Sequence, residues 1–276
     1  MLILKAILYG ILEGVTEWLP VSSTGHLILL EQVLILPMSE AAIELFEVVI
    51  QLGAMMAVLV LFWRKLTPFG GQNFKMRCKE TCLLWGRVLL AALPAALIGL
   101  LLDDWIDLHL FHPVVVAAAL ILYGLLFILL EKRRKLHPFG GFLAENAEDI
   151  PPKTAFGVGC FQVLALVPGT SRSGATILGG LCLGLSRPAA AEFSFFLGVP
   201  TMLGAGLLKG VKFFGEGNVL SGDEVTVIAT GALTAFLISL AAIRFLTDFV
   251  RRHTFVGFGV YRILLGAAVM ASAFLS

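Results

Sequence analysis

The sequence predicts an all-α integral membrane protein, a polytopic bundle of about six full spans with two re-entrant half-helix pairs and an inverted-topology repeat. The first observation is composition, because 58% of the residues are hydrophobic and only 14% are charged. Soluble domains carry roughly a quarter charged residues. The second observation is a set of apolar runs that reach the roughly 20 residues of a spanning helix. The third is a pair of apolar segments that Pro, Ser and Gly interrupt in the middle.

The apolar runs and the interrupted segments follow one another in a regular order. Neither interrupted segment suits a continuous span, because non-helical backbone is tolerated at membrane depth only where protein or a water-filled cavity covers it. We therefore expect a re-entrant pair of half-helices over 2–30 and another over 154–185. Full spans are expected at 42–62, 87–102, 113–131, 189–208, 225–243 and 255–275.

Short matching patterns relate the two halves of the chain. Each half reads as a re-entrant pair followed by three spans, so the second half starts from the opposite side of the membrane. Inverted repeats of this kind place their site near the midplane, between the halves. We expect one membrane domain over 1–276, with halves of about 1–131 and 154–276 joined by a cytoplasmic loop over 132–153. The matches pair Glu13, Ser22 and Gly25 with Gln162, Ser171 and Gly174, and Glu47 and Gly53 with Glu192 and Gly198.

Loop charges predict the orientation of the chain. Stretches 64–87, 132–153 and 244–252 hold six, five and three of the 20 Lys and Arg residues, whereas 31–41 and 103–112 hold none. Because cytoplasmic loops are enriched in Lys and Arg, the first three stretches should be cytoplasmic and both termini should face outward. The first hairpin then enters from outside and the second from the cytoplasm. A net charge of +1 gives no reason to expect a nucleic-acid partner. The solvated outer loop is expected to carry Asp103, Asp104 and Asp107.

Two carboxylates lie in the apolar start of the chain, at Glu13 and Glu17. Residues four apart share one face of a helix. Two carboxylates there could hold a divalent metal ion, or one could act as a base while the other tunes it. Ionisable residues within membrane segments are costly, which favours a functional role over a carboxylate that is neutralised by protonation or by a salt bridge.

A group of hydroxyls follows directly, in Pro20-Val21-Ser22-Ser23-Thr24-Gly25-His26. Pro20 should end the first half-helix, and Gly25 permits a tight turn. The hydroxyls either cap the next half-helix or present a nucleophile. Ser23 and His26 are three apart and could act together as nucleophile and base, although His26 could itself be the nucleophile.

The most informative segment is the second hydroxyl-rich loop, around Arg172. A phosphate needs a planar cation, hydroxyl donors, and glycines that let backbone N–H groups approach. An arginine at membrane depth is a functional-site candidate by default, and the start of a half-helix would add donors and a favourable dipole. Candidate phosphate ligands are Ser22, Thr24, Gly169, Thr170, Ser171, Arg172, Ser173, Gly174 and Thr176. Two such polar segments in one membrane protein suggest a single site.

Polar residues in the spans are weaker candidates. They could line a cavity or simply bridge helices, and Arg262 beside Tyr261 could pair with a carboxylate. The run from Glu131 to Lys135 fits a topology signal better than a lipid-binding patch. The cavity candidates are Glu47, Gln51, Glu192 and Ser194.

These segments resemble the undecaprenyl-pyrophosphate phosphatase family of the bacitracin-resistance type. The resemblance lies in Glu13 to His26, Phe46 to Gly53, Pro168 to Thr176 and Ala191 to Phe195, and it spans the whole chain. The family's acidic pair falls on Glu13 and Glu17 and its histidine on His26. Its Pro-Gly-x-Ser-Arg-Ser-x-x-Thr motif is matched from Pro168 to Thr176.

The resemblance implies a multi-pass enzyme of the bacterial cytoplasmic membrane that hydrolyses undecaprenyl diphosphate to the monophosphate and inorganic phosphate. This reaction recycles the lipid carrier for peptidoglycan and other envelope polymers. The resemblance also implies a divalent cation (Mg²⁺ or Ca²⁺), an outward-facing site and lower sensitivity to bacitracin. The sequence also admits a homodimer without fixing the oligomeric state.

The role assignment that best fits the residues makes Ser23 the nucleophile. Glu17 and His26 would handle protons, Glu13 with Glu17 would lie near the metal, and Arg172 with its neighbouring hydroxyls would hold phosphate. The choice between Ser23 and His26 stays open. The competing interpretation is a transporter or flippase of a phosphorylated lipid, because broken helices in inverted repeats are a transporter signature.

Overall fold

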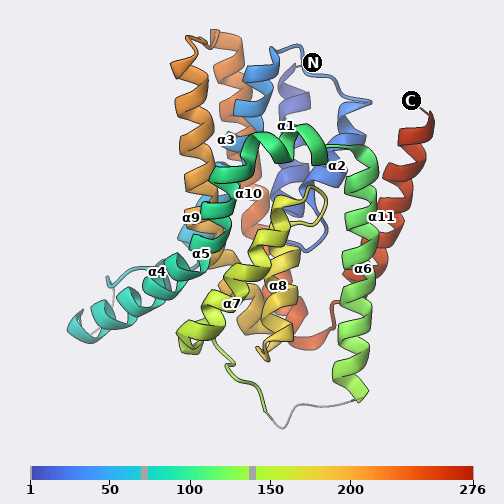
Figure 1. Cartoon of the computed structure of the whole chain (residues 1–276). Coiled ribbons are helices and arrows are strands. Elements are labelled where there is room, and N and C mark those ends of the chain that lie inside the picture. Colours follow the sequence, from blue (N-terminus) through green and yellow to red (C-terminus); the bar gives the residue numbers. More distant parts are fainter. Residues whose placement is uncertain (1, 70–73, 137–140, 276) are drawn as a thin grey trace.

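The computed structural model describes residues 2–69, 74–136 and 141–275, and the side chains of Asp103, Asp104 and Asp107 lie outside its described part. The described residues form helices joined by turns and loops, and their β-structure is limited to an isolated bridge between Ala144 and Leu185. The main helices are α1 (Leu2–Thr16), α2 (Ser23–Glu31), α3 (Glu40–Leu61), α4 (Trp63–Leu66), α5 (Phe74–Leu110), α6 (Pro113–Leu136), α7 (Pro152–Val163), α8 (Arg172–Cys182), α9 (Arg187–Gly215), α10 (Gly222–Arg252) and α11 (Val256–Leu275). Figure 1 shows their arrangement.

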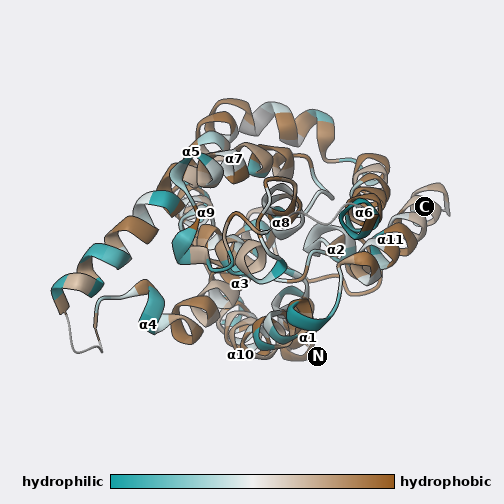
Figure 2. Ribbon diagram, turned by 90° about the horizontal axis from the view of Figure 1, so that it is seen from below, coloured by the Kyte–Doolittle hydropathy of each residue, from teal (hydrophilic) through white to brown (hydrophobic). Residues whose placement is uncertain are grey.

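Six helices in the described residues are long and apolar enough to cross a membrane, namely α3, α5, α6, α9, α10 and α11. The predicted number and order of spans are therefore confirmed. Their outer surfaces are apolar: Leu101, Val211 and Leu264 are 80%, 72% and 65% exposed. Figure 2 shows hydrophobic residues along these long helices. Such a surface suits contact with lipid tails.

Several predicted loops are helical instead. Helix α5 covers Phe74–Leu110, although the sequence suggested loops over 64–87 and 103–112. Helix α10 likewise continues through 244–252 to Arg252. Charged residues end a membrane span without ending a helix, because Lys, Arg and Glu are good helix formers. Charge bias therefore located the ends of the hydrophobic segments rather than the ends of the helices.

The two expected re-entrant pairs are short hairpins that enter from opposite ends of the bundle (Figure 1). The first is α1 with α2, and the second is α7 with α8. These four helices have 15, 9, 12 and 11 residues, which is shorter than the roughly 20 residues of a full span. Their turns meet inside the bundle, where α9 and α10 also pass.

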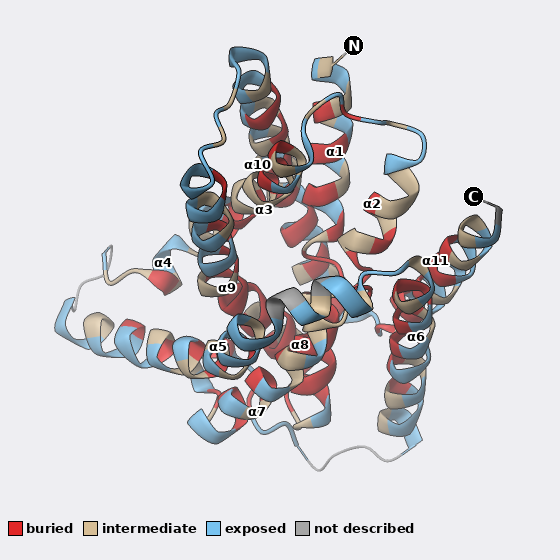
Figure 3. Ribbon diagram, turned by 45° about the horizontal axis from the view of Figure 1, so that its top comes forward, coloured by how far each residue is buried: buried red, intermediate tan, exposed pale blue. Residues whose placement is uncertain are grey.

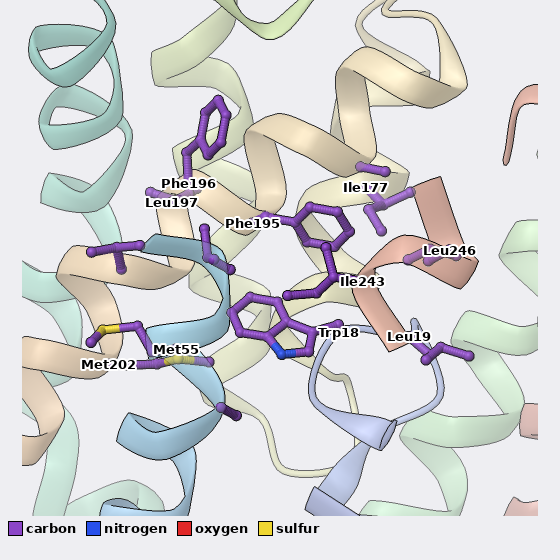
Figure 4. Packing of buried hydrophobic residues seen from close by; sticks show 14 of the residues in the cluster. Trp18, Leu19, Met55, Ile177, Phe195, Phe196, Leu197, Met202, Ile243 and Leu246 are labelled. Carbon is purple, nitrogen blue, oxygen red and sulfur yellow. The ribbon is translucent and has the colours of Figure 1, made fainter. Parts of the chain in front are cut away.

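The core lies around these turns, as the buried residues in Figure 3 show. Trp18, at the first turn, is fully buried and packs edge-to-face against Phe195 of α9, with ring centroids 5.6 Å apart. Figure 4 shows Trp18 and Phe195 among aliphatic side chains from α3, α8 and α10. The core therefore fixes the hairpin turns against the long helices.

Candidate functional site

The first turn is built by an interrupted helix. The helical geometry of α1 continues to Glu17, whose N–H donates to the Glu13 carbonyl at 3.0 Å. Pro20 lacks a donor and cannot extend the helix. Ser22 has φ +74°, a conformation that L-residues rarely adopt, and α2 begins directly after it at Ser23. The reversal brings the start of α2 beside the end of α1.

The second turn repeats this geometry. Gly169 has φ +89°, and a Cβ there would meet the Val116 backbone at 2.5 Å, so only glycine fits. Ser171 has φ +70°, and its Oγ caps α8 by accepting from the Gly174 N–H at 3.2 Å. Helix α8 begins at Arg172. Ser22 and Ser171 therefore share an unusual conformation at positions that the sequence repeat pairs.

The two turns meet through Arg172 and Glu17. The Arg172 Nη2 and Nε atoms donate to Glu17 Oε1 at 3.1 and 3.4 Å, and Nη1 donates to the Ser194 carbonyl at 2.6 Å. The guanidinium also lies over the Trp18 ring, 5.3 Å from its centroid. The other oxygen of Glu17, Oε2, accepts from Ser23 Oγ at 3.5 Å. Nucleophile candidate, carboxylate and cation thus form one connected group.

A cavity of about 220 Å³ opens beside this group. The starts of both α2 and α8 line it, so two helix N-termini with their positive dipole ends border one space. This is the arrangement that binds anions such as phosphate. The predicted site residues that line the cavity are Glu17, Ser22, Ser23, Thr24, Gln51, Gly169, Ser171 and Arg172.

Other predicted phosphate ligands join protein segments and do not line this cavity. Ser173 Oγ lies 3.1 Å from the carbonyl oxygens of Glu17 and of Leu19, so it fastens the second turn to the first. Thr176 Oγ1 donates to the Arg172 carbonyl at 2.8 Å and lies 2.7 Å from Ser194 Oγ. Buried hydroxyls need such partners because an unsatisfied polar group is costly. Thr170 and Gly174 are also buried and do not line the cavity.

Arg262 has a role that the sequence did not reveal. Its side chain is fully buried in α11 and donates to three backbone carbonyls, those of Pro20, Gly169 and Thr170, at 3.2, 2.9 and 2.8 Å. The prediction that Arg262 pairs with a carboxylate is therefore wrong. Tight turns leave carbonyls without backbone donors, and a guanidinium with five donors can serve both turns at once.

His26 does not line the cavity that Glu17, Ser23 and Arg172 share. Its Nδ1 donates to the Ser22 carbonyl at 2.7 Å. In the neutral ring Nε2 is then the acceptor, so the Tyr261 hydroxyl, 2.7 Å away, donates to it. His26 lines a separate, largely apolar cavity of about 410 Å³ together with Phe245 and Phe258. The Ser23 hydroxyl donates to Glu17, and the catalytic role of His26 stays a prediction.

The weaker cavity candidates separate clearly. Gln51 lines the cavity, whereas Glu47, Glu192 and Ser194 do not. Glu192 instead forms an ion pair with Lys65 at 2.5 Å, and Lys65 also pairs with Glu148 at 3.0 Å. The sequence pattern could not separate these roles, because a polar residue in a span can either bridge helices or line a cavity.

Gln162 is a cavity residue that the site prediction missed. It is 2% exposed, lines the cavity, and its side-chain oxygen and nitrogen have no hydrogen-bond partner in the described part of the chain. Buried polar groups are normally satisfied, so this amide is available to a ligand. The signal was present in the repeat, which pairs Gln162 with Glu13.

The chemistry of the two glutamates fits a divalent cation. Glu13 is fully buried, and neither of its carboxylate oxygens accepts a hydrogen bond from the described residues. No group of three or more His, Cys, Asp or Glu side chains in the described chain could hold a metal by itself. Mg²⁺ is commonly held by one or two carboxylates together with substrate phosphates. Glu13 and Glu17 supply that number, and of the two Glu17 lines the cavity while Glu13 lies buried earlier in the chain, in α1.

Fold and site together define an integral membrane protein with a cavity between two hairpin turns, bordered by an arginine and two helix N-termini. The chain belongs to the family described as bacitracin resistance protein BacA, whose model matches residues 6–268. It is 49% identical to an undecaprenyl-diphosphatase of Enterococcus faecalis, over 96% of this chain and 95% of that protein. Proteins with the same name from Streptococcus suis and Latilactobacillus sakei are 50% and 48% identical, each over 99% of this chain and 98% of the relative.

Proposed function

We propose that this protein is an undecaprenyl-diphosphate phosphatase, which converts undecaprenyl diphosphate to undecaprenyl phosphate and inorganic phosphate. The observation that carries the proposal is the connected group of Ser23, Glu17 and Arg172 at a cavity bordered by two helix N-termini. Relatives that are about half identical over nearly the full length carry the name of this activity. The cavity offers the donors that a diphosphate requires.

Ser23 is the proposed nucleophile. When a substrate phosphate replaces Glu17 as the partner of Arg172, the Glu17 carboxylate is free to accept the Ser23 hydroxyl proton. Ser23 Oγ then attacks the terminal phosphorus. The P–O bond to the lipid phosphate breaks, and its electron pair leaves with that phosphate. Water then attacks the phosphoserine, the proton on Glu17 returns to Ser23, and inorganic phosphate leaves with the water's two protons.

Charge stabilisation would come from groups that are in place before the reaction. Arg172 is held by the Ser194 carbonyl, and this bond can persist when a substrate phosphate replaces Glu17 as its partner, so the guanidinium stays oriented as negative charge develops. The helix starts at Ser23 and Arg172 add backbone donors. Mg²⁺ or Ca²⁺ held by Glu13 and Glu17 would neutralise part of the diphosphate charge.

The proposed orientation places the cavity on the outer side of the bacterial cytoplasmic membrane. The positive-inside rule supports it, because Lys and Arg concentrate at one end of the bundle. The isoprenoid tail would stay in lipid and enter laterally, and the product would return to peptidoglycan synthesis. By removing the diphosphate form that bacitracin sequesters, the enzyme would confer resistance. A homodimer stays a prediction, which cross-linking in membranes would test.

Helix packing supports the inverted repeat, which we retain as a proposal. If α1, α3 and α5 correspond to α7, α9 and α10, each contact in one half should have a counterpart in the other. Helix α1 packs on α10 and α7 on α5, while α3 packs on α10 and α9 on α5. Helices α6 and α11 pack on each other, as expected for elements exchanged by a twofold axis.

This symmetry keeps lipid transport as the second candidate. Hairpins that enter from opposite ends toward one site are typical of transporters. A protein that only moves a phosphorylated lipid would bind it without cleaving it. Phosphate release therefore separates the two candidates.

The test is phosphate release from undecaprenyl diphosphate by purified protein with Mg²⁺, with Ca²⁺ and with EDTA. We expect metal-dependent release that Ser23→Ala abolishes and Arg172→Ala strongly reduces, with Arg133→Ala as a control whose side chain is exposed and outside the cavity. Absence of release from folded wild-type protein would favour transport. Release that survives Ser23→Ala but is lost in His26→Ala would move the nucleophile to His26.

A further inference from the structure

A second cavity lies at the last turns of α6, which is the lower end of that helix in Figure 1. Its volume is about 620 Å³, compared with about 220 Å³ for the candidate active site. It is lined by four cations, Lys132, Arg134, Lys135 and Arg187, and by one carboxylate, Glu131. The cavity therefore has a strong positive excess. None of these residues takes part in the proposed hydrolysis.

The single carboxylate cannot neutralise the four cations. Glu131 is 3% exposed, and its oxygens accept from Arg187 Nε and Nη2 at 2.7 and 2.6 Å. Oε1 also accepts from the Phe255 N–H at 3.1 Å. These bonds fix Arg187 of α9 at the edge of the cavity and occupy the carboxylate. Among the described residues, neither Lys132 nor Lys135 forms an ion pair with it.

The remaining cations differ in how they are held. Arg134 donates to the Leu185 carbonyl at 3.1 Å and lies over the Phe142 ring, 5.5 Å from its centroid, which orients its guanidinium. Lys132 and Lys135 are exposed and form no hydrogen bond or ion pair with the described residues. Two oriented guanidiniums with two mobile ammonium groups form a suitable receptor for a phosphate.

The apolar part of the wall identifies the kind of phosphate. Ile128 of α6, Val256 of α11 and Phe142 share the cavity with the cations. The cavity thus offers charge and hydrocarbon side by side, at the end of a span where lipid headgroups lie. A topology signal needs only a count of Lys and Arg near the span. It does not require an arginine from α9 fixed by a buried carboxylate.

We propose that this cavity binds the phosphate headgroup of an anionic membrane phospholipid, with an acyl chain against the apolar wall. Basic pockets between transmembrane helices recognise such headgroups. The site would join α6 of the first half to α9 and α11 of the second through a lipid. It is independent of the proposed hydrolysis.

The test measures phosphatidylglycerol retained by the purified full-length protein in competition with phosphatidylcholine, by native mass spectrometry. The double variant K132Q/K135Q should retain roughly thirtyfold less phosphatidylglycerol, given the contribution of each surface cation. The matched control R133Q/R252Q removes the same charge from exposed positions that do not line the cavity. It should retain the wild-type amount.

A second variant tests the cavity without changing charge. Thr254 is exposed and lines the cavity, so T254W should fill it and reduce phosphatidylglycerol binding. Equal losses in both double variants, or a loss in neither, would overturn the proposal. Binding of inorganic phosphate and of undecaprenyl phosphate is measured in two separate experiments. If either binds at these lysines while phosphatidylglycerol does not, the phospholipid assignment is wrong.

Discussion

The two hairpins share a backbone design but differ in how deeply they are buried. Each turn places a serine at positive φ directly before a helix, Ser22 before α2 and Ser171 before α8. Every residue of α8 from Ser173 to Leu181 is buried, whereas Gly25 and Leu27 are the buried residues of α2. Figure 3 shows this contrast. The second hairpin is a packed frame for Arg172, and the first carries Glu17 and Ser23, the residues that we propose to react.

Small residues explain the difference. In α8 a Cβ on Gly179 would lie 2.5 Å from the Phe161 side chain, and one on Gly180 would lie 3.0 Å from that of Ala190. The missing side chains let α8 approach α7 and α9 closely. Helix α2 carries larger apolar residues that remain partly exposed, such as Ile28. The two hairpins thus differ in how tightly their helices pack, rather than in the backbone geometry of their turns.

Removal of one hydroxyl from each hairpin should give the largest difference in activity between the two hairpins. Ser23→Ala removes the proposed nucleophile, and we expect kcat for phosphate release to fall by about 10⁴ or more. Ser173→Ala removes a hydroxyl that joins the turns, so it should lower the free energy of unfolding by about 1–2 kcal/mol and leave more activity. Similar activity losses in both variants would mean that the hairpins do not divide their roles this way.

Substitution of Arg172, the cation of the second hairpin, should have the next largest effect on activity. Arg172→Ala removes the proposed charge stabiliser, and kcat should fall by about a hundredfold to a thousandfold. Arg172→Lys should recover little, because an ammonium cannot reproduce the several directed donors of the guanidinium. Steady-state kinetics on both variants, beside Arg133→Ala, provide the measurement. Full rescue by lysine would show that charge alone matters there.

Loss of the arginine that serves both turns should affect stability. Arg262→Met leaves the carbonyls of Pro20, Gly169 and Thr170 without this buried donor. We expect the free energy of unfolding to fall by about 3 kcal/mol, measured by denaturant unfolding in detergent micelles. Tyr261→Phe is a neighbouring control, because the Tyr261 hydroxyl forms its hydrogen bond with His26 and with no turn carbonyl of the described residues. An unchanged stability in Arg262→Met would mean that other donors can replace it.

Replacement of each serine at positive φ by glycine should give the smallest difference, which is a difference in stability. Glycine adopts positive φ without the steric cost that serine bears. Ser171→Gly also loses a helix cap, whereas Ser22 makes no side-chain cap bond. Ser22→Gly should therefore be the more stabilising by about 0.5–1 kcal/mol, measured by thermal unfolding of both variants. The reverse order would show that the buried Ser22 hydroxyl has a partner in solution.

The sequence by itself determined the membrane class, the six spans, the two interrupted segments and the residues Glu17, Ser23 and Arg172. Hydrophobic length and isolated polar residues carry this information, because each is costly in lipid without a structural reason. Only the tertiary structure decided which polar groups face the cavity. Ser171 faces it while Ser173 joins the turns, although both lie in one motif. That choice depends on the rotation of α8 against α7 and α9, which local sequence does not specify.

The same limit applies to the two arginines. Arg172 and Arg262 are both single cations in apolar surroundings, yet one meets a carboxylate and the other meets backbone carbonyls. Their partners lie 155 and 93 residues away in the sequence (Glu17 and Gly169). A residue type states what a site can bind, but the contacts that exist are set by packing between distant segments. The sequence therefore supplied the chemistry, and the fold decided which groups perform it.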